Sequence, residues 1–380
     1  MKKKLFIVSF ATFVSTTSLA LIAANSNKTA DLLNAEENEL WYHYQAIEPT
    51  DSTHGSKEFW ANCSTHNFSL TQPASDNIEE GVPFATTVYF DELEMTDERY
   101  IPSISKQKSL GMLPVVKSGN ITYGLYPQTR ITDSSLISSL NAIKNTESNG
   151  WYLYEEEYYA SVKATPANSS MTFLDGTTIT ANKKYWFKCN PIQWKILYTG
   201  TNDYLLFSNV ALDKQVYYNS TSTRTIDGKT IYPSNYQHSD VRTWLNNNFY
   251  NTAFSLNSSY VKTTAVNNSA SQTDNENITY YCDNTNDKVF LLSYKELLNS
   301  SYGFGTSTSN NSARKRNNTD YSLARGATVR TGPASCLTRS PWGGHYNKIW
   351  YINGSNGSLN YGDATTSYNA VCPAITLMKQ

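Results

Sequence analysis

The side chains best suited to metal chemistry gather near the start of the chain. Three of the chain's five histidines and one cysteine fall between positions 43 and 66, at His43, His54, Cys63 and His66. Imidazole and thiolate are the usual ligands of structural zinc, and Cys63 and His66 have a workable pair spacing. A zinc site would hold together a unit that is short of core residues. Because the spacing matches no standard zinc finger, scattered surface histidines are the alternative, and we expect no other cofactor.

A second group of candidate metal ligands lies in the run DNTND at positions 283–287. Asp283, Thr285 and Asp287 occupy alternate positions, as at the start of a calcium-binding loop. Such a loop requires glycine at its sixth position and glutamate at its twelfth, where this chain has Lys288 and Tyr294. The run therefore fails as an EF-hand, and we interpret it as a turn before a strand.

Motifs for catalysis are absent from the sequence, which contains no G-x-S-x-G, H-E-x-x-H, Walker or dinucleotide-binding pattern. The acidic run Glu155–Glu157 has tyrosines on both sides, but a glycosidase needs two carboxylates that flank one bond, and neighbours on a strand point to opposite faces. We interpret this run as a solvated acidic loop. The sequence thus favours a non-catalytic protein, with an extracellular hydrolase or cysteine-dependent enzyme as the alternative.

The best candidate for a ligand-binding loop is the run SPWGGHYNK at positions 340–348. Trp342, His345 and Tyr346 stand among glycines between two predicted strands. Exposed Trp and Tyr rings stack on sugar faces and anchor protein interfaces. The alternative is that Trp342 turns inward and anchors the loop.

Composition is typical of an exported binding protein. Charged residues make up 17% of the chain and Tyr occurs 28 times, a pattern that suits binding surfaces, although genomic codon bias would produce it equally well. The net charge of −1 removes any electrostatic case for nucleic acid or an anionic membrane as partner. One short basic patch in a polar loop is predicted to be solvated: Arg314, Lys315 and Arg316.

The cysteines do not form an obvious disulfide framework, because their number is odd and their spacing wide: Cys63, Cys189, Cys282, Cys336 and Cys372. We interpret most of them as small buried apolar residues. Cys336 and Cys372 can pair if the strands that carry them are neighbours.

Short strands and helices must position these side chains. Alternation of Ile192, Trp194, Ile196 and Tyr198 with polar residues predicts a half-buried strand, and 192–208 reads as a hairpin. Further strands are predicted at 85–90, 287–292, 336–339, 348–352 and 371–377. Helices are predicted to begin at Ser239 and close at Asn246–Asn248, to begin at Ser293 with a capping box to Glu296, and to run from Thr319 to Arg325 with a stop at Gly326.

The N-terminus resembles a secretory signal in its composition. Lys2, Lys3 and Lys4 precede an uncharged run from Leu5 to Ala24 that ends in small residues. We predict a cleaved signal peptide at 1–24, with a membrane anchor as the alternative, since 20 residues are about the length that spans a bilayer. A flexible leader at 25–37, a small unit at 38–118 and a second domain at 119–380 follow.

Several motifs, in order, resemble an uncharacterised domain family of secreted and surface-attached bacterial proteins: YGLYPQT (123–129), FLDGT (173–177), YWFKCNPIQWKIL (185–197), SDVRTWLNNNFYNTAFS (239–255), DKVFLLSYKEL (287–297), TDYSLA (319–324), LTRSPW (337–342) and AVCPAITL (370–377). The late Arg-Ser strand and the terminal V-x-P-A strand also resemble the C-type-lectin-like fold, including its formylglycine-generating-enzyme branch. Family members usually have Arg before Pro-Ala, where this chain has Cys372. Residues 41–73 resemble, in degenerate form, the Cys/His module that often precedes this domain.

These observations predict an α+β fold with short strands, a few short helices and long loops in a C-type-lectin-like domain. We expect a secreted or cell-surface protein that binds a glycan or a surface protein through loops at 300–318 and 340–363. A purely structural surface component is a further alternative. No nucleic-acid partner is expected, and no membrane span after signal cleavage.

Overall fold

The computed structural model describes residues 4–7, 87–90, 104–328 and 332–379. The chain divides into two compact units, Met1–Ser109 and Leu110–Gln380. In the first unit, β1 (Lys4–Ile7) pairs antiparallel with β2 (Thr87–Phe90), which confirms the strand expected at 85–90, and α4 (Ile104–Ser109) follows. The predicted zinc ligands lie outside the described residues, as do most of the predicted signal peptide and all of the leader: His43, His54, Cys63 and His66.

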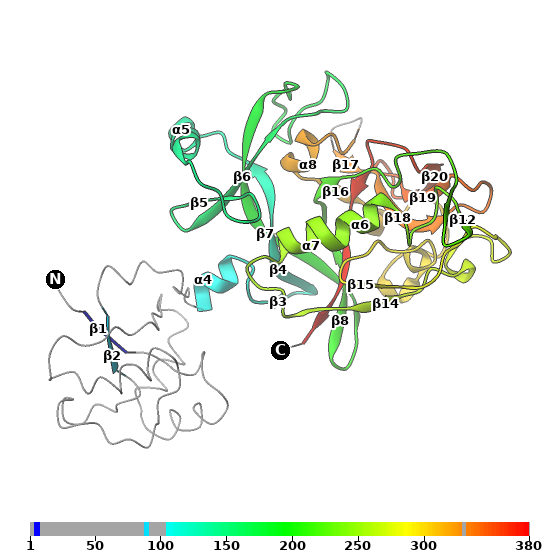
Figure 1. The fold of residues 1–380 in the computed structure, drawn as a ribbon, viewed down its shortest axis with the longest axis horizontal. Coiled ribbons are helices and arrows are strands. Elements are labelled where there is room, and N and C mark those ends of the chain that lie inside the picture. The colour runs from blue at the N-terminus through cyan, green and yellow to red at the C-terminus, as the bar shows by residue number, and fades with distance from the viewer. Residues whose placement is uncertain (1–3, 8–86, 91–103, 329–331, 380) are drawn as a thin grey trace, which may run out of the picture. The chain divides into compact units, whose positions relative to one another are not determined.

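The second unit is built on an eight-stranded sheet in which β7 (Lys184–Thr199) is the longest strand (Figure 1). The main path runs β13-β22-β8-β7-β4-β3, β6 also pairs with β7, β5 pairs with β6, and every pairing is antiparallel. The β7–β8 pair confirms the hairpin predicted at 192–208. The other strands are β3 (Val115–Lys117), β4 (Asn120–Arg130), β5 (Tyr152–Tyr154), β6 (Glu157–Lys163), β8 (Asp203–Ser208), β13 (Val261–Lys262) and β22 (Ala374–Met378).

A register irregularity interrupts the alternation predicted for β7. It falls between Ile196 and Tyr198, so that Leu197 is 5% exposed while Tyr198 is 56% exposed. An extra residue in one strand turns the following side chains to the opposite face. Ile192 and Trp194, which precede the irregularity, are fully buried as predicted.

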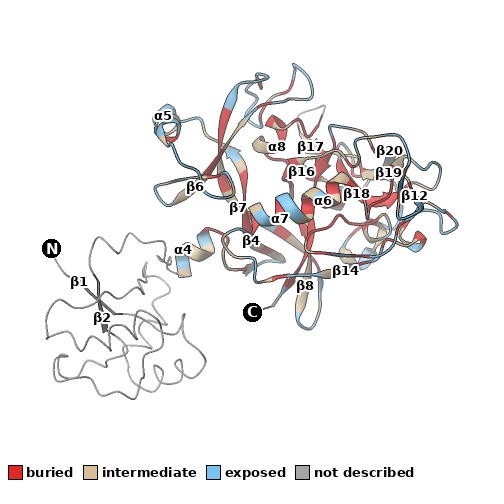
Figure 2. Ribbon diagram, viewed as in Figure 1, coloured by how far each residue is buried: buried red, intermediate tan, exposed pale blue. Residues whose placement is uncertain are grey.

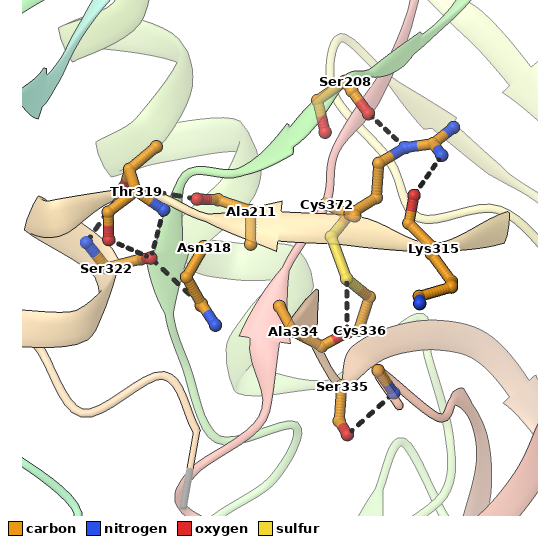
Figure 3. The surroundings of a disulfide bond; sticks show 12 residues. Ser208, Ala211, Lys315, Asn318, Thr319, Ser322, Ala334, Ser335, Cys336 and Cys372 are labelled. Atoms are coloured by element: carbon orange, nitrogen blue, oxygen red, sulfur yellow. Dashed lines mark hydrogen bonds between the residues drawn. A yellow bond between two sulfur atoms is a disulfide. The ribbon is translucent and has the colours of Figure 1, made fainter. Parts of the chain in front are cut away.

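A second, five-stranded sheet carries the C-terminal loops. Its order is β10-β21-β18-β19-β20, and a disulfide joins Cys336 of β18 to Cys372 just after β21 (Figure 3). Strands 336–339, 348–352 and 371–377 are therefore confirmed, although the last is divided between the two sheets. Its strands are β10 (Asp213–Lys214), β18 (Cys336–Pro341), β19 (Lys348–Ile352), β20 (Leu359–Asp363) and β21 (Ala370–Val371).

Three small sheets complete the β structure. One has the order β17-β16-β9, and β11 pairs with β12 and β14 with β15. The strand predicted at 287–292 is largely wrong, because β15 ends at Asp287 and only an isolated bridge joins Phe290 to Ala374. The bounds are β9 (Val210–Ala211), β11 (Arg224–Ile226), β12 (Lys229–Ile231), β14 (Thr264–Val266), β15 (Thr285–Asp287), β16 (Arg316–Asn318) and β17 (Pro333–Ala334).

The helices are short, and two of them begin at the predicted caps Ser239 and Thr319, whereas the helix predicted from Ser293 is only a 3-10 turn over Glu296–Leu298. The Ser239 side chain caps α6 by accepting a hydrogen bond from the Arg242 N–H. Thr319 and Ser322 form a capping box at α8. The helix after Ser239 does not close at Asn246–Asn248, because it continues through a π-helical turn, η5, to the end of α7. The bounds are α5 (Ser134–Ala142), α6 (Asp240–Trp244), η5 (Leu245–Phe249), α7 (Tyr250–Ala253), α8 (Asp320–Ala324), and the 3-10 turns η6 (Ala270–Gln272), η7 (Glu296–Leu298), η8 (Ser300–Tyr302) and η9 (Ser312–Arg314).

Aromatic side chains fill the main core between the large sheet and this helix. Trp194 is fully buried and its Nε1 donates to the carbonyl of Tyr123 at 2.8 Å. Phe254, just after α7, stacks on Tyr123, and Phe249 packs against Tyr126. Buried residues line the strands of both sheets, while exposed residues concentrate in loops and on α5 (Figure 2). The unit is thus the mixed α+β fold that the sequence predicts, mostly strands with few short helices.

Candidate functional site

The loop between β18 and β19 holds Trp342 flat against a second aromatic ring. Trp342 stacks on Tyr361 of β20 with ring centroids 3.7 Å apart and planes 6° apart. Gly344 closes over the indole, since a Cβ at that position would lie 2.1 Å from the Trp342 ring. Trp342 is partly buried against the core, whereas Tyr361 is 46% exposed. The indole is therefore a support, and Tyr361 is the ring presented to solvent.

The other two predicted ligand residues lie in the same loop and are exposed. Tyr346 is 38% exposed, and the His345 ring stacks on it at 4.6 Å. Tyr346 also contacts Tyr232, which in turn contacts Tyr280, at 5.7 and 5.9 Å. We name this group the aromatic surface: Tyr232, Tyr280, Trp342, His345, Tyr346 and Tyr361.

Hydrogen bonds from distant segments fix the backbone of this loop. Asp274 Oδ1 accepts from Trp350 Nε1 at 2.7 Å and from the Gly343 N–H at 2.8 Å. The Tyr280 hydroxyl donates to the Trp342 carbonyl at 3.0 Å, and the Ser234 hydroxyl donates to the Tyr346 carbonyl at 2.6 Å. A loop held in this way presents its rings with little conformational entropy left to lose on binding.

Sequence reasoning missed three members of the aromatic surface. Tyr361 lies within the range 340–363 expected to bind ligand, but nothing in its local sequence singles it out. Tyr232 and Tyr280 come from segments far away in the chain, and only the tertiary fold brings them to the loop. No signal in the sequence distinguishes them from the other tyrosines.

A hollow of about 770 Å³ lies elsewhere on the second unit, and we call it the polar cleft. Tyr198 and Tyr302 line it, together with Asn299 and two ion pairs. Lys262 Nζ lies 2.7 Å from Asp203, and Arg339 Nη1 lies 2.5 Å from Glu296. Lys262 and Arg339 are therefore each matched by a carboxylate, and Lys295 is a further cation in the lining of the cleft.

Glu296 in the polar cleft is an ion-pair partner rather than a proton donor. Burial by itself raises its pKa, but the charge and hydrogen bonds of Arg339 outweigh burial and hold the pKa below its usual range. It also accepts from the Ser293 N–H at 2.8 Å, and Ser293 Oγ accepts from the Glu296 N–H at 3.0 Å, which confirms the predicted capping box. A general acid requires the opposite shift in pKa.

The basic patch at 314–316 is not solvated, contrary to the expectation from sequence. Arg314 is 0% exposed and Arg316 5% exposed. Arg314 donates to five backbone carbonyls, which replace water: Leu297, Gly305, Ser307, Ser309 and Gly357. Arg316 lies over the Phe207 ring at 4.2 Å, and burial lowers its pKa to about 10.

The acidic side chains at 155–157 and 283–287 have structural roles. Glu155 and Glu156 have positive φ angles of 47° and 60° and form the exposed turn between β5 and β6. Asp287 is buried beside Arg242 at 2.7 Å and accepts from the Thr285 hydroxyl. Across the described ranges no three His, Cys, Asp or Glu side chains gather closely enough to hold a metal ion.

Two of the remaining cysteines are buried thiols. Cys189 and Cys282 are both unpaired, in agreement with the small-apolar interpretation. Burial raises the pKa of Cys282 to about 11 and that of Cys189 well above its ordinary value. Neither thiol is therefore a nucleophile at neutral pH.

Comparison with known proteins finds a family match in the second unit. None of the described helices is long and apolar enough to cross a membrane. No curated protein and no solved structure matches the chain. Residues 201–379, which carry the whole aromatic surface, match the family described as Domain of unknown function (DUF6273).

Proposed function

We propose that this chain is a secreted or cell-surface binding protein that recognises a cell-surface glycan through the aromatic surface of a C-type-lectin-like domain. The observation that carries the proposal is the Trp342–Tyr361 stack, which presents an exposed ring on a partly buried support. The C–H faces of sugar rings are apolar and stack on flat aromatic rings.

Rigidity of Tyr361 supports this assignment. Its ring contacts two tryptophans: it stacks face to face on Trp342, and the Trp350 ring meets it in a T-shaped contact at 5.9 Å and 88°. Trp350 is in turn held by Asp274. A ring that is already fixed loses little entropy when a ligand stacks on it, so more of the stacking energy appears as affinity.

Polar groups beside the rings supply the hydrogen bonds that a sugar requires. His345 is exposed and its Nδ1 lies 2.6 Å from Asn347 Oδ1, while Lys348 Nζ lies 5.7 Å from the Tyr361 ring centroid. Sugar sites combine apolar stacking with a few such groups that fix orientation. The matched ion pairs of the polar cleft favour binding over catalysis as the role of this domain.

The test is binding of the full chain to an array of bacterial wall and host glycans, beside the variant Tyr361→Ala. We expect saturable binding that Tyr361→Ala weakens by about tenfold, the size of one lost stacking contact. Tyr198→Ala is the matched control, because Tyr198 is an exposed tyrosine of the polar cleft and lies outside the aromatic surface.

Two outcomes would contradict the proposal. Binding that Tyr198→Ala and Tyr361→Ala weaken equally would place the ligand elsewhere. Failure to bind any glycan, with retention on intact cells that protease treatment abolishes, would identify a surface protein as the ligand instead. Thermal unfolding of each variant shows whether its fold is intact.

A further inference from the structure

A separate hollow of about 390 Å³ collects positive charge on the second unit. Lys214 of β10 and Arg325 at the end of α8 line it, and three hydroxyl groups surround them: Thr165, Thr365 and Ser367. None of the described residues that line this hollow is a carboxylate. It contrasts with the polar cleft, where Lys262 and Arg339 each meet an acidic partner.

A buried carboxylate outside this hollow fixes Arg325. Asp213 is 3% exposed in its side chain, and its Oδ1 accepts from Arg325 Nε at 3.1 Å. Its Oδ2 accepts from the Tyr126 hydroxyl at 2.7 Å, and Oδ1 also accepts from the Lys214 N–H at 2.7 Å. The capacity of Asp213 to accept is therefore largely used, and its position is set by groups from β4, β10 and α8.

Among the described residues, the ends of both cations have no further ion-pair or hydrogen-bond partner. No further hydrogen bond joins the Arg325 guanidinium to a described residue, and its side chain is 34% exposed. Lys214 forms no ion pair with a described residue. Burial and the neighbouring Arg325 charge lower the pKa of Lys214, and Asp213 only partly offsets them. The two cations thus repel each other, which an anion between them would relieve.

We infer that this hollow binds a singly charged oxyanion, a carboxylate or a phosphodiester group, between Arg325 and Lys214. The two cations and the single carboxylate of Asp213 leave one net positive charge. Arg325 supplies a planar pair of donors, Lys214 a point charge, and the hydroxyl groups of Thr365 and Ser367 further hydrogen bonds, whereas the Thr165 hydroxyl donates to the Arg325 carbonyl. We call the hollow the oxyanion site. The oxyanion site is separate from the aromatic surface, because the two share no residue.

The test is calorimetric titration of the full chain, at low ionic strength, with three probes. Glucuronate supplies a carboxylate, glycerophosphoglycerol supplies a phosphodiester, and glucose supplies neither. We expect one or both anions to bind and glucose not to. Lys214→Gln should weaken anion binding by about tenfold, because a charge-assisted hydrogen bond is lost. This variant leaves the Asp213–Arg325 pair in place, so the fold is not at risk.

The outcomes distinguish a carboxylate ligand from a phosphodiester ligand, and they also show whether the site binds an anion at all. Binding of glucuronate alone would assign a carboxylate, and binding of glycerophosphoglycerol alone would assign a phosphodiester. Arg325→Gln should abolish binding of either, with its fold checked by thermal unfolding, since it leaves Asp213 without its cation. Lys117→Gln, a charge removed from exposed strand β3, is the matched control. Absence of anion binding, or binding that Lys214→Gln and Lys117→Gln leave equally strong, would overturn the inference.

Discussion

At the residue scale, Arg314 holds together loops that lie far apart in the chain. Its guanidinium reaches carbonyls between Leu297 and Ser309 and also that of Gly357. In Arg314→Met the volume is roughly kept, but these buried carbonyls lose their donor, and each unsatisfied group costs about 1–3 kcal/mol. We expect the free energy of unfolding, measured by urea denaturation, to fall by at least about 3 kcal/mol.

The matched control for this prediction is the neighbouring lysine. Lys315 is only partly buried, and Lys315→Met removes a charge of the same sign from the same loop. It should change the free energy of unfolding by no more than about 0.5 kcal/mol. Equal losses in the two variants would mean that the loop, rather than the five hydrogen bonds of Arg314, determines the stability.

At the same scale, local sequence could predict the loop that carries the candidate site but not the roles within it. Glycines beside Trp342, His345 and Tyr346 indicate an exposed aromatic loop, and the structure places all three there. Which ring faces solvent depends on Tyr361, nineteen positions further on, and on Gly344 covering the indole. Local sequence likewise predicts Arg314 to be a surface charge, because the carbonyls that accept its hydrogen bonds come from other parts of the chain.

At the scale of elements, the disulfide between Cys336 and Cys372 ties β18 to the end of the chain. The two cysteines are 36 positions apart, and closing a loop of that size stabilises a protein by about 3–4 kcal/mol. We expect a reducing agent to lower the thermal midpoint of the wild type clearly. The variant with Cys336→Ala and Cys372→Ala together should start lower and show no response to reductant.

Cys189→Ala provides the control for the disulfide. Cys189 is buried and unpaired, so this variant should respond to reductant as strongly as the wild type does. A wild-type midpoint that reductant leaves unchanged would show that the bridge adds nothing to stability under these conditions.

Elements defined by local interactions were predictable, and those that depend on tertiary contacts were not. The capping box at Ser293 and Glu296 involves residues three apart and was read from sequence. The asparagines after Leu245 instead suggested a helix end, because Asn favours caps and turns. In the structure Asn246 stays helical, and its side chain bonds the Lys288 N–H and the Val289 carbonyl. The segment at Lys288 and Val289 therefore provides hydrogen bonds that keep Asn246 helical, and the local sequence around Asn246 does not reveal this contact.

At the scale of the whole molecule, the aromatic surface and the oxyanion site are built from different strands and loops. The loop between β18 and β19 and strand β20 carry four rings of the aromatic surface, and Tyr232 and Tyr280 join them from other segments. The oxyanion site instead joins β10, the end of α8 and the loop after β20. The low overall charge of the chain thus conceals a local positive site, because Lys214 and Arg325 are far apart in sequence.

The two surfaces should therefore differ in their dependence on salt. Between about 0.1 M and about 1 M sodium chloride, the screening length falls from about 10 Å to about 3 Å. Binding of an anion by partly exposed cations should weaken severalfold over this range, whereas stacking on Tyr361 should change by less than about twofold. Glycan and anion titrations of the full chain at both salt concentrations measure the difference. Parallel salt dependence of the two ligands would mean that they share one charged site, and that Tyr361 and Lys214 do not serve separate surfaces.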